Sequence, residues 1–129
     1  MNNLNKESVI GISALLVHAA HIDEIYTDHE KELIIDFIKS YITDTEASKI
    51  LKEAEEIEKN SNQLLNYTNI IKKNSLDIKK DIVEHLWKVI ISDNSVDQYE
   101  SNLMRRICGL IYFPDKECAE IKLKLLQSK

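Results

Sequence analysis

Two pairs of carboxylates occur at the same spacing in this chain. Asp23 and Glu30 are seven residues apart in "HIDEIYTDHE", and Asp93 and Glu100 are seven residues apart in "ISDNSVDQYE". Carboxylate oxygens are the ligands that Mg²⁺, Ca²⁺ and Mn²⁺ prefer in proteins. If the two oxygens of each pair converge, each segment predicts a site for a divalent cation, with loop carbonyls and water as the remaining ligands. We call residues 23–30 and 93–100 the acidic loops.

A structural explanation of the acidic loops stands beside the metal explanation. Thr27 and Glu30 match the capping-box pattern at the start of a helix, and Asp97 is placed like Thr27. Asp23 and Asp93 fall in the last turn of an apolar helix, where a negative charge opposes the helix dipole by about 0.3–1 kcal/mol. Either a cation or a backbone N–H of the next helix would compensate that charge. The spacing is not that of an EF-hand.

A second set of metal-ligand types precedes the first acidic loop. His18 and His21 are three residues apart, a spacing that places two imidazoles on one helical face, close to Asp23. Most such pairs are not ligands, and Lys88 and Ile91 stand 70 residues further along the chain. The histidine pair is therefore not part of the repeated pattern. His29 and His85 are predicted to be surface or rim residues.

The chain carries no recognisable catalytic pattern. No Ser-His-Asp or Cys-His arrangement and no glycine-rich phosphate loop can be assembled from it, which predicts a protein that is not an enzyme. Cys108 and Cys118 lack the C-x-x-C spacing and are interpreted as apolar filler. Trp87 lies on a core stripe and is interpreted as packing.

Helices are the elements that must position these side chains. The 129 residues include only two glycines and one proline, too few for the turns of a β-rich fold. Apolar residues recur at helical spacing in seven stretches. These stretches are residues 7–22, 27–42, 43–57, 64–74, 75–90, 97–111 and 114–125.

An offset of 70 residues relates the two halves of the chain. The matching positions are Leu16 and Leu86, Ala19 and Val89, Ala20 and Ile90, Asp23 and Asp93, Thr27 and Asp97, Glu30 and Glu100, Leu33 and Leu103, Phe37 and Ile107. Neither half could bury its apolar faces alone. We therefore expect one all-α domain, residues 1–129, built as a compact bundle of about seven helices. Its repeat halves, about 6–60 and 76–129, would be related by a pseudo-twofold axis.

Charge and hydropathy limit the partners. The net charge of −5 and the pI near 5.4 leave no basic stripe, so nucleic-acid binding is not expected. No apolar run approaches the ~20 residues of a membrane span, and the start of the chain lacks an export signal. These features predict a cytoplasmic protein without membrane insertion. Protein partners are expected, and a homo-oligomer stays open.

Two segments of the chain resemble a known family. "LLVHAAHIDEIYTDHEKELI" and "LWKVIISDNSVDQYESNLMRRICGLI" are similar to the twice-repeated signature of TerB-like proteins, the tellurite-resistance TerB superfamily, in its stand-alone bacterial branch. The resemblance implies an all-helical, non-enzymatic domain of tellurite and stress response. It also implies a divalent cation bound by the acidic-loop residues Asp23, Glu30, Asp93 and Glu100. The alternative is a protein-interaction module of the co-chaperone type, because relatives elsewhere are fused to J domains.

The acidic loops depart from the family pattern on both sides of the Asp, and Ile22 and Ser92 replace its alanine. The family usually has Ala-Asp-Gly, but Glu24 and Asn94 stand at the glycine positions of this chain. Asn tolerates the left-handed backbone that glycine adopts, and Glu does so poorly. The second acidic loop is therefore predicted to keep the family geometry better than the first.

Overall fold

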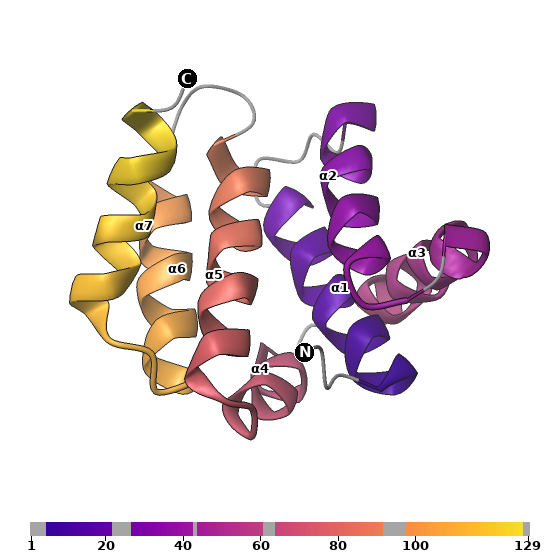
Figure 1. Cartoon of the computed structure of the whole chain (residues 1–129), viewed down its shortest axis with the longest axis horizontal. Helices are drawn as coiled ribbons and strands as arrows, with labels where there is room; N and C mark the ends of the chain where they lie inside the picture. The colour runs from indigo at the N-terminus through magenta and orange to yellow at the C-terminus, as the bar shows by residue number, and fades with distance from the viewer. Residues whose placement is uncertain (1–4, 22–26, 43, 61–63, 92–97, 128–129) are drawn as a thin grey trace.

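Seven helices make up the part of the chain that the computed structural model describes, and that part contains no strand. The described residues are 5–21, 27–42, 44–60, 64–91 and 98–127. The helices, drawn in Figure 1, are α1 (Lys6–Ala20), α2 (Asp28–Lys39), α3 (Asp44–Asn60), α4 (Leu64–Lys72), α5 (Leu76–Ile91), α6 (Gln98–Leu110) and α7 (Asp115–Gln127). The predicted all-α bundle is confirmed.

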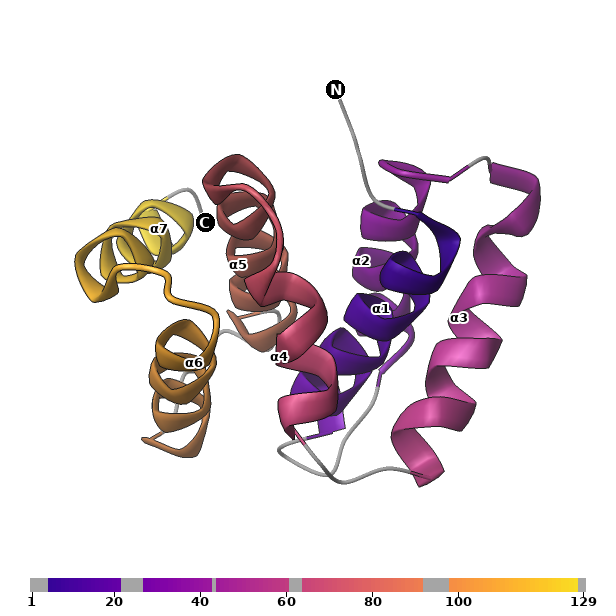
Figure 2. The ribbon, with the colours of Figure 1, turned by 90° about the horizontal axis from the view of Figure 1, so that it is seen from below.

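The helices form two groups, and α4 links them along the chain. Helices α1, α2 and α3 lie together in Figure 1, α5, α6 and α7 lie together on the other side, and α4 lies between the groups at one end of the bundle. Figure 2 shows the same division from below. Helix α1 packs against α2, α3, α4 and α5, whereas α5 packs against α1, α2, α6 and α7. Helices α1 and α5 are thus the central ones of their groups.

Helix α1 is buried on most of its sides, as its dense apolar sequence predicts. The side chain of Asn5 accepts a hydrogen bond from the backbone N–H of Ser8 at 2.8 Å, which caps the first turn. Ten residues of the helix are buried: Val9, Gly11, Ile12, Ser13, Ala14, Leu15, Leu16, Val17, Ala19 and Ala20. Gly11 faces α4, where a methyl group in place of its hydrogen would overlap Cδ1 of Ile70. The small residue therefore allows α4 to approach α1 closely.

The helix starts follow the spacing of the sequence repeat. Helix α1 begins at Lys6 and α5 at Leu76, 70 residues later, and the same interval separates the starts of α2 and α6. Paired apolar positions are fully buried in both groups, among them Leu16 with Leu86 and Phe37 with Ile107. The predicted core is confirmed at these positions. The pseudo-twofold superposition of the two halves stays a prediction.

A polar contact connects the two groups at the interface of α2 and α5. The hydroxyl of Tyr41, just after α2, donates a hydrogen bond to the carboxylate of Asp81 in α5. Burial raises the pKa of Tyr41 well above its usual value, and the hydrogen bond to Asp81 and the charge of Asp81 raise it further. His85 is partly buried at the rim of this interface, and its Nδ1 lies 2.8 Å from the carbonyl oxygen of Asp81. Its ring meets that of Phe37 edge to face.

A tight reversal links α6 to α7. Tyr112 has φ of 61°, and the backbone N–H of Phe113 donates to the carbonyl of Cys108 at 2.8 Å, which closes the end of α6. The backbone N–H of Cys118 then donates to the carbonyl of Pro114 at 3.0 Å, in the first turn of α7. Helix α6 therefore ends at Leu110, and α7 begins at Asp115, directly after Pro114. No helix among the described residues has the length and apolar character needed to cross a membrane.

Candidate functional site

The start of α2 is the part of the first acidic loop that the structure describes. The hydroxyl of Thr27 accepts a hydrogen bond from the backbone N–H of Glu30 at 3.2 Å. In return, Oε1 of Glu30 accepts the backbone N–H of Thr27 at 2.8 Å and its hydroxyl at 3.2 Å. The predicted capping box is therefore confirmed. The side chain of Glu30 is held in one orientation and is only 5% exposed.

The other predicted ligands lie outside the described residues. Asp23 and Asp93 belong to the segments 22–26 and 92–97, and Glu100 belongs to α6 with its side chain outside the described part. The convergence of each carboxylate pair, and the better geometry of the second acidic loop, therefore stay predictions. Within the described ranges, no group of three or more His, Cys, Asp and Glu side chains is placed to hold a metal ion.

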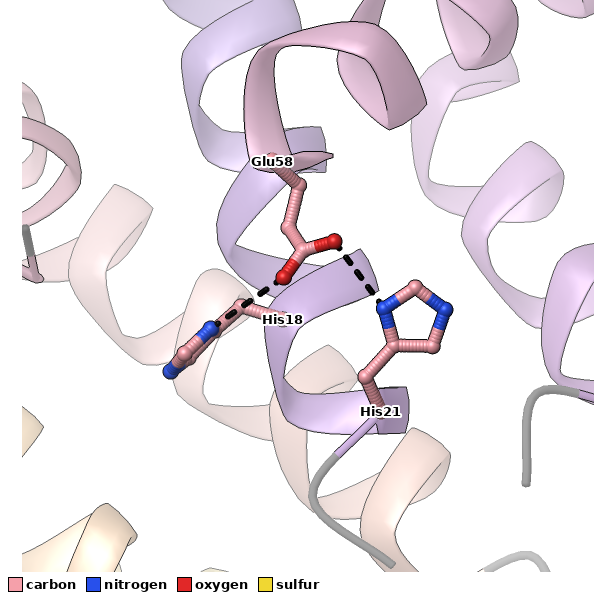
Figure 3. A network of polar contacts seen from close by, with 3 residues as sticks. All are labelled: His18, His21 and Glu58. Atoms are coloured by element: carbon pink, nitrogen blue, oxygen red, sulfur yellow. Dashed lines mark hydrogen bonds and ion pairs between the residues drawn. The ribbon is translucent and has the colours of Figure 1, made fainter. Parts of the chain in front are cut away.

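The end of α1 carries a cluster of three polar side chains that the sequence analysis did not assemble. His18 and His21 both contact Glu58, which comes from the last turns of α3 (Figure 3). Nδ1 of His21 lies 2.9 Å from Oε1 of Glu58, and Nδ1 of His18 lies 3.4 Å from Oε2. One carboxylate thus accepts hydrogen bonds from two imidazoles, one at each oxygen. We call His18, His21 and Glu58 the histidine clamp.

The position of Glu58 could have been found from its spacing. Ala47, Leu51 and Ala54 form the buried stripe of α3, and Glu58 continues that stripe four residues after Ala54. The side chain of Glu58 is accordingly only 12% exposed. The sequence analysis did not single out Glu58. A carboxylate on an apolar stripe is the signal that was missed.

The histidine clamp joins the ends of α1 and α3 directly before the first acidic loop. Each imidazole donates through Nδ1 when that nitrogen carries the proton, and protonation of the ring adds a full charge to the contact. His18 is the less exposed ring and also lies 6.4 Å from the ring of Tyr67, centroid to centroid. The cluster therefore restrains the end of α1, from which the chain enters the acidic loop.

The second helix group does not repeat the histidine clamp. Lys88 and Ile91 occupy the positions 70 residues after His18 and His21, and Ile91 is buried in the core with 2% exposure. The sequence prediction that the histidine pair is not part of the repeat is confirmed. The chemistry at the ends of α1 and α5 therefore differs, although the flanking apolar positions agree.

The described residues form an all-helical domain in which the carboxylate of Glu30 takes part in the capping box of α2, and the family comparison names the class of this domain. The family model described as "Tellurite resistance protein TerB" matches residues 10–123. This match covers most of the chain, so the chain belongs to the TerB family. No curated protein and no solved structure matches it.

Proposed function

We propose that this TerB-family domain acts by binding and not by catalysis, in tellurite or stress response, and that it holds a divalent cation at its acidic loops. The ligands would be Asp23 and Glu30 in the first loop and Asp93 and Glu100 in the second. The observation that carries the proposal is the buried carboxylate of Glu30, which the capping box fixes at the start of α2.

The orientation of Glu30 supports this proposal. A carboxylate that is already immobilised loses little conformational entropy when it binds a cation. Its hydrogen bonds from Thr27 hold it toward the chain that enters α2, and Asp23 is only four residues before Thr27. A cation between Asp23 and Glu30 would also offset the negative charge that the sequence places three residues after the last residue of α1, Ala20. Oxygen-only ligation favours Mg²⁺, Ca²⁺ or Mn²⁺ over zinc.

Metal content and thermal stability test this proposal together. Protein purified without chelator is analysed for bound metal, and melting curves are recorded with chelator and with added Mg²⁺, Ca²⁺ or Mn²⁺. A cation that binds only the folded chain at a hundred times its Kd stabilises it by about 2.7 kcal/mol. We expect one of the three ions to raise the Tm of the wild type, less so for Asp23→Ala or Asp93→Ala and least for the double variant.

Asp28→Ala is the matched control for charge. Asp28 lies in the first turn of α2 beside Glu30, is exposed, and carries the same charge as Asp23. Its removal weakens general electrostatic attraction equally but removes no proposed ligand, so the ion-dependent shift should persist. Absence of both bound metal and any ion-dependent shift in the wild type would eliminate the cation. An equal loss of the shift in Asp28→Ala would attribute it to general charge.

The second candidate function is a protein-interaction module, favoured by exposed leucines on α7. Leu123 is 57% exposed and Leu126 is 38% exposed, and their spacing of three residues places them on one helical face. A second copy of the chain is the partner tested first, by light scattering over a range of protein concentrations. A dimer that dissociates in Leu123→Lys but not in Glu120→Lys would support this function, and a monomer throughout would remove the dimer.

A further inference from the structure

The second helix group brings two cysteines together at the α6–α7 reversal. Cys108 lies near the end of α6 and is fully buried, and Cys118 lies in the first turns of α7 with 6% exposure. The backbone hydrogen bond from Phe113 to the carbonyl of Cys108 fixes the reversal between them. The two thiols are near enough for an interaction between them to be the first cause of the pKa shift of each. Sequence spacing had given these residues no role beyond filling the core.

The surroundings of the two sulfurs are unequal. The pKa of Cys118 is lowered to about 7, first by the hydrogen bond with Cys108 and also by Trp87 and Lys122, against the opposing effect of burial. Asp115 acts in the opposite direction. The same hydrogen bond raises the pKa of Cys108, with burial as the second cause. Cys118 is thus the better thiolate, and Cys108 keeps its proton.

Aromatic and basic groups lie around Cys118. Nζ of Lys122 lies 5.4 Å from the centroid of the Trp87 ring. The indole N–H of Trp87 is buried and makes no well-formed hydrogen bond within the described residues, although it lies near enough to Cys118 to favour the thiolate. A negative charge on Cys118 would therefore be compensated from both α5 and α7.

A pocket is lined in part by Cys118 and not by Cys108. Its volume is about 400 Å³, and its lining includes Trp87, Met104, Arg105, Cys118 and Lys122, while Cys108 is not among the lining residues. Two basic side chains, the acidic side chain of Asp115, an aromatic ring and one cysteine therefore line the same space. The cysteine that lines the pocket is also the cysteine whose thiol ionises more readily.

We propose that Cys118 and Cys108 form a redox pair in which hydrogen peroxide oxidises Cys118 and Cys108 then closes a disulfide between α6 and α7. In the first step the Cys118 thiolate attacks one peroxide oxygen, an S–O bond forms, the O–O bond breaks, and the leaving hydroxide takes a proton to become water. The sulfur is oxidised by two electrons to a sulfenic acid and the peroxide is reduced. In the second step the sulfur of Cys108 attacks the sulfenyl sulfur, the S–S bond forms, the S–O bond breaks, and water leaves with the proton of Cys108.

The disulfide would change the stability of the second helix group and not of the first. It would tie the end of α6 to the start of α7 across the reversal at Tyr112 and Pro114. A cross-link of this kind restricts the unfolded chain, so the oxidised protein should melt at a higher temperature than the reduced protein. The inference does not depend on the proposed cation, because no acidic-loop ligand takes part.

Mass spectrometry of the intact, folded chain tests this redox pair. The full-length protein is reduced, freed of reductant, treated with hydrogen peroxide, and then blocked with a maleimide. We expect the wild type to lose two hydrogen atoms and both maleimide sites, and dithiothreitol to reverse the change. Cys108→Ala should instead stop at a single added oxygen that dimedone traps on Cys118. In Cys118→Ala, oxidation of Cys108 should be at least about tenfold slower, since a buried, protonated thiol reacts poorly.

Substitution of two residues near Cys118 distinguishes a thiol that is reactive because its pKa is lowered from one that is reactive only because it is accessible. Lys122→Gln should slow alkylation of Cys118 by iodoacetamide at pH 7, and Asp115→Asn should accelerate it, because their charges act on its pKa in opposite directions. Lys116→Gln, an exposed residue of the same helix, is the control for net charge. Circular dichroism verifies that each variant is folded. Equal oxidation rates of the two cysteines, or failure of the folded wild type to form the disulfide, would overturn the proposal.

Discussion

The two helix groups place similar cores beneath different polar chemistry. Where α1 meets α3, the contact ends in the histidine clamp, with Glu58 between two imidazoles. Where α5 meets α7, the contact has Trp87 beside Cys118. Buried apolar positions 70 residues apart agree, yet polar and reactive side chains do not. The two helix groups are therefore alike in their buried apolar positions and differ in the polar side chains near the helix ends.

Truncation of a paired core leucine should have the largest effect on stability of all the substitutions that test this comparison. Leu16 and Leu86 are both fully buried, at equivalent positions of α1 and α5. Truncation of either to alanine removes buried methyl groups and leaves a cavity, so each variant should lose about 2–5 kcal/mol of unfolding free energy. Urea denaturation followed by circular dichroism measures this loss.

The exposed Leu76 provides the control for the leucine pair. Leu76, at the start of α5, is 52% exposed, so Leu76→Ala should change stability by less than about 0.5 kcal/mol. A small effect of Leu16→Ala beside a large effect of Leu86→Ala would show that only the second group carries the core, and would contradict the symmetrical interpretation.

Tyr41→Phe tests the polar contact between the groups and should have an intermediate effect. Loss of the hydrogen bond to Asp81 should lower the unfolding free energy by about 1 kcal/mol at neutral pH. The folded-state pKa of Tyr41 lies above its unfolded value of 10.0, so its contribution is complete below pH 10 and declines as the pH rises beyond that value. Denaturation at a series of alkaline pH values measures the difference.

The expected signature is convergence of the two proteins in alkali. Wild type should lose more stability above pH 10 than Tyr41→Phe does. The phenol of Tyr41 loses its proton in the unfolded wild type at a pH at which the folded protein still holds it, and the variant has no phenol to ionise at this position. A constant gap between the two proteins at every pH would show that Tyr41 contributes by packing alone.

Glu58→Gln should give the smallest effect and is specific to the first group. The contact from His21 is partly exposed, so replacing the carboxylate by an amide should cost about 0.5 kcal/mol. Glu56→Gln, on the exposed side of α3, removes the same charge without touching either histidine and should be neutral. Thermal melts compare the two variants, and equal changes in Tm would show that Glu58 acts only through its net charge.

The local elements of the fold were predictable because their signals are short-range. The pattern Thr-x-x-Glu at Thr27 and Glu30 predicted the capping box, since both partners lie within one helical turn. Helical periodicity likewise predicted the burial of Leu16 and Phe37. The predicted cation ligands Asp23 and Asp93 lie outside the described residues, so that part of the candidate site is untested.

Contacts between distant residues were not predictable in the same way. Glu58 is 40 residues from His18, and no spacing rule relates a carboxylate on one helix to an imidazole on another. Cys108 and Cys118 are ten residues apart on two helices, without the C-x-x-C pattern. Only the reversal between α6 and α7 places their sulfurs together. Sequence analysis therefore assigned them to the core and found no chemistry.

The sequence by itself determined the helices, their caps, the apolar stripes and the family, because backbone hydrogen bonding and helical periodicity act over a few residues. The tertiary structure alone decided which helix ends meet, and with them the histidine clamp, the contact between Tyr41 and Asp81, and the pairing of the two thiols. The reason is physical. Which polar groups come within hydrogen-bond distance depends on the packing of whole helices, and packing depends on all buried side chains at once.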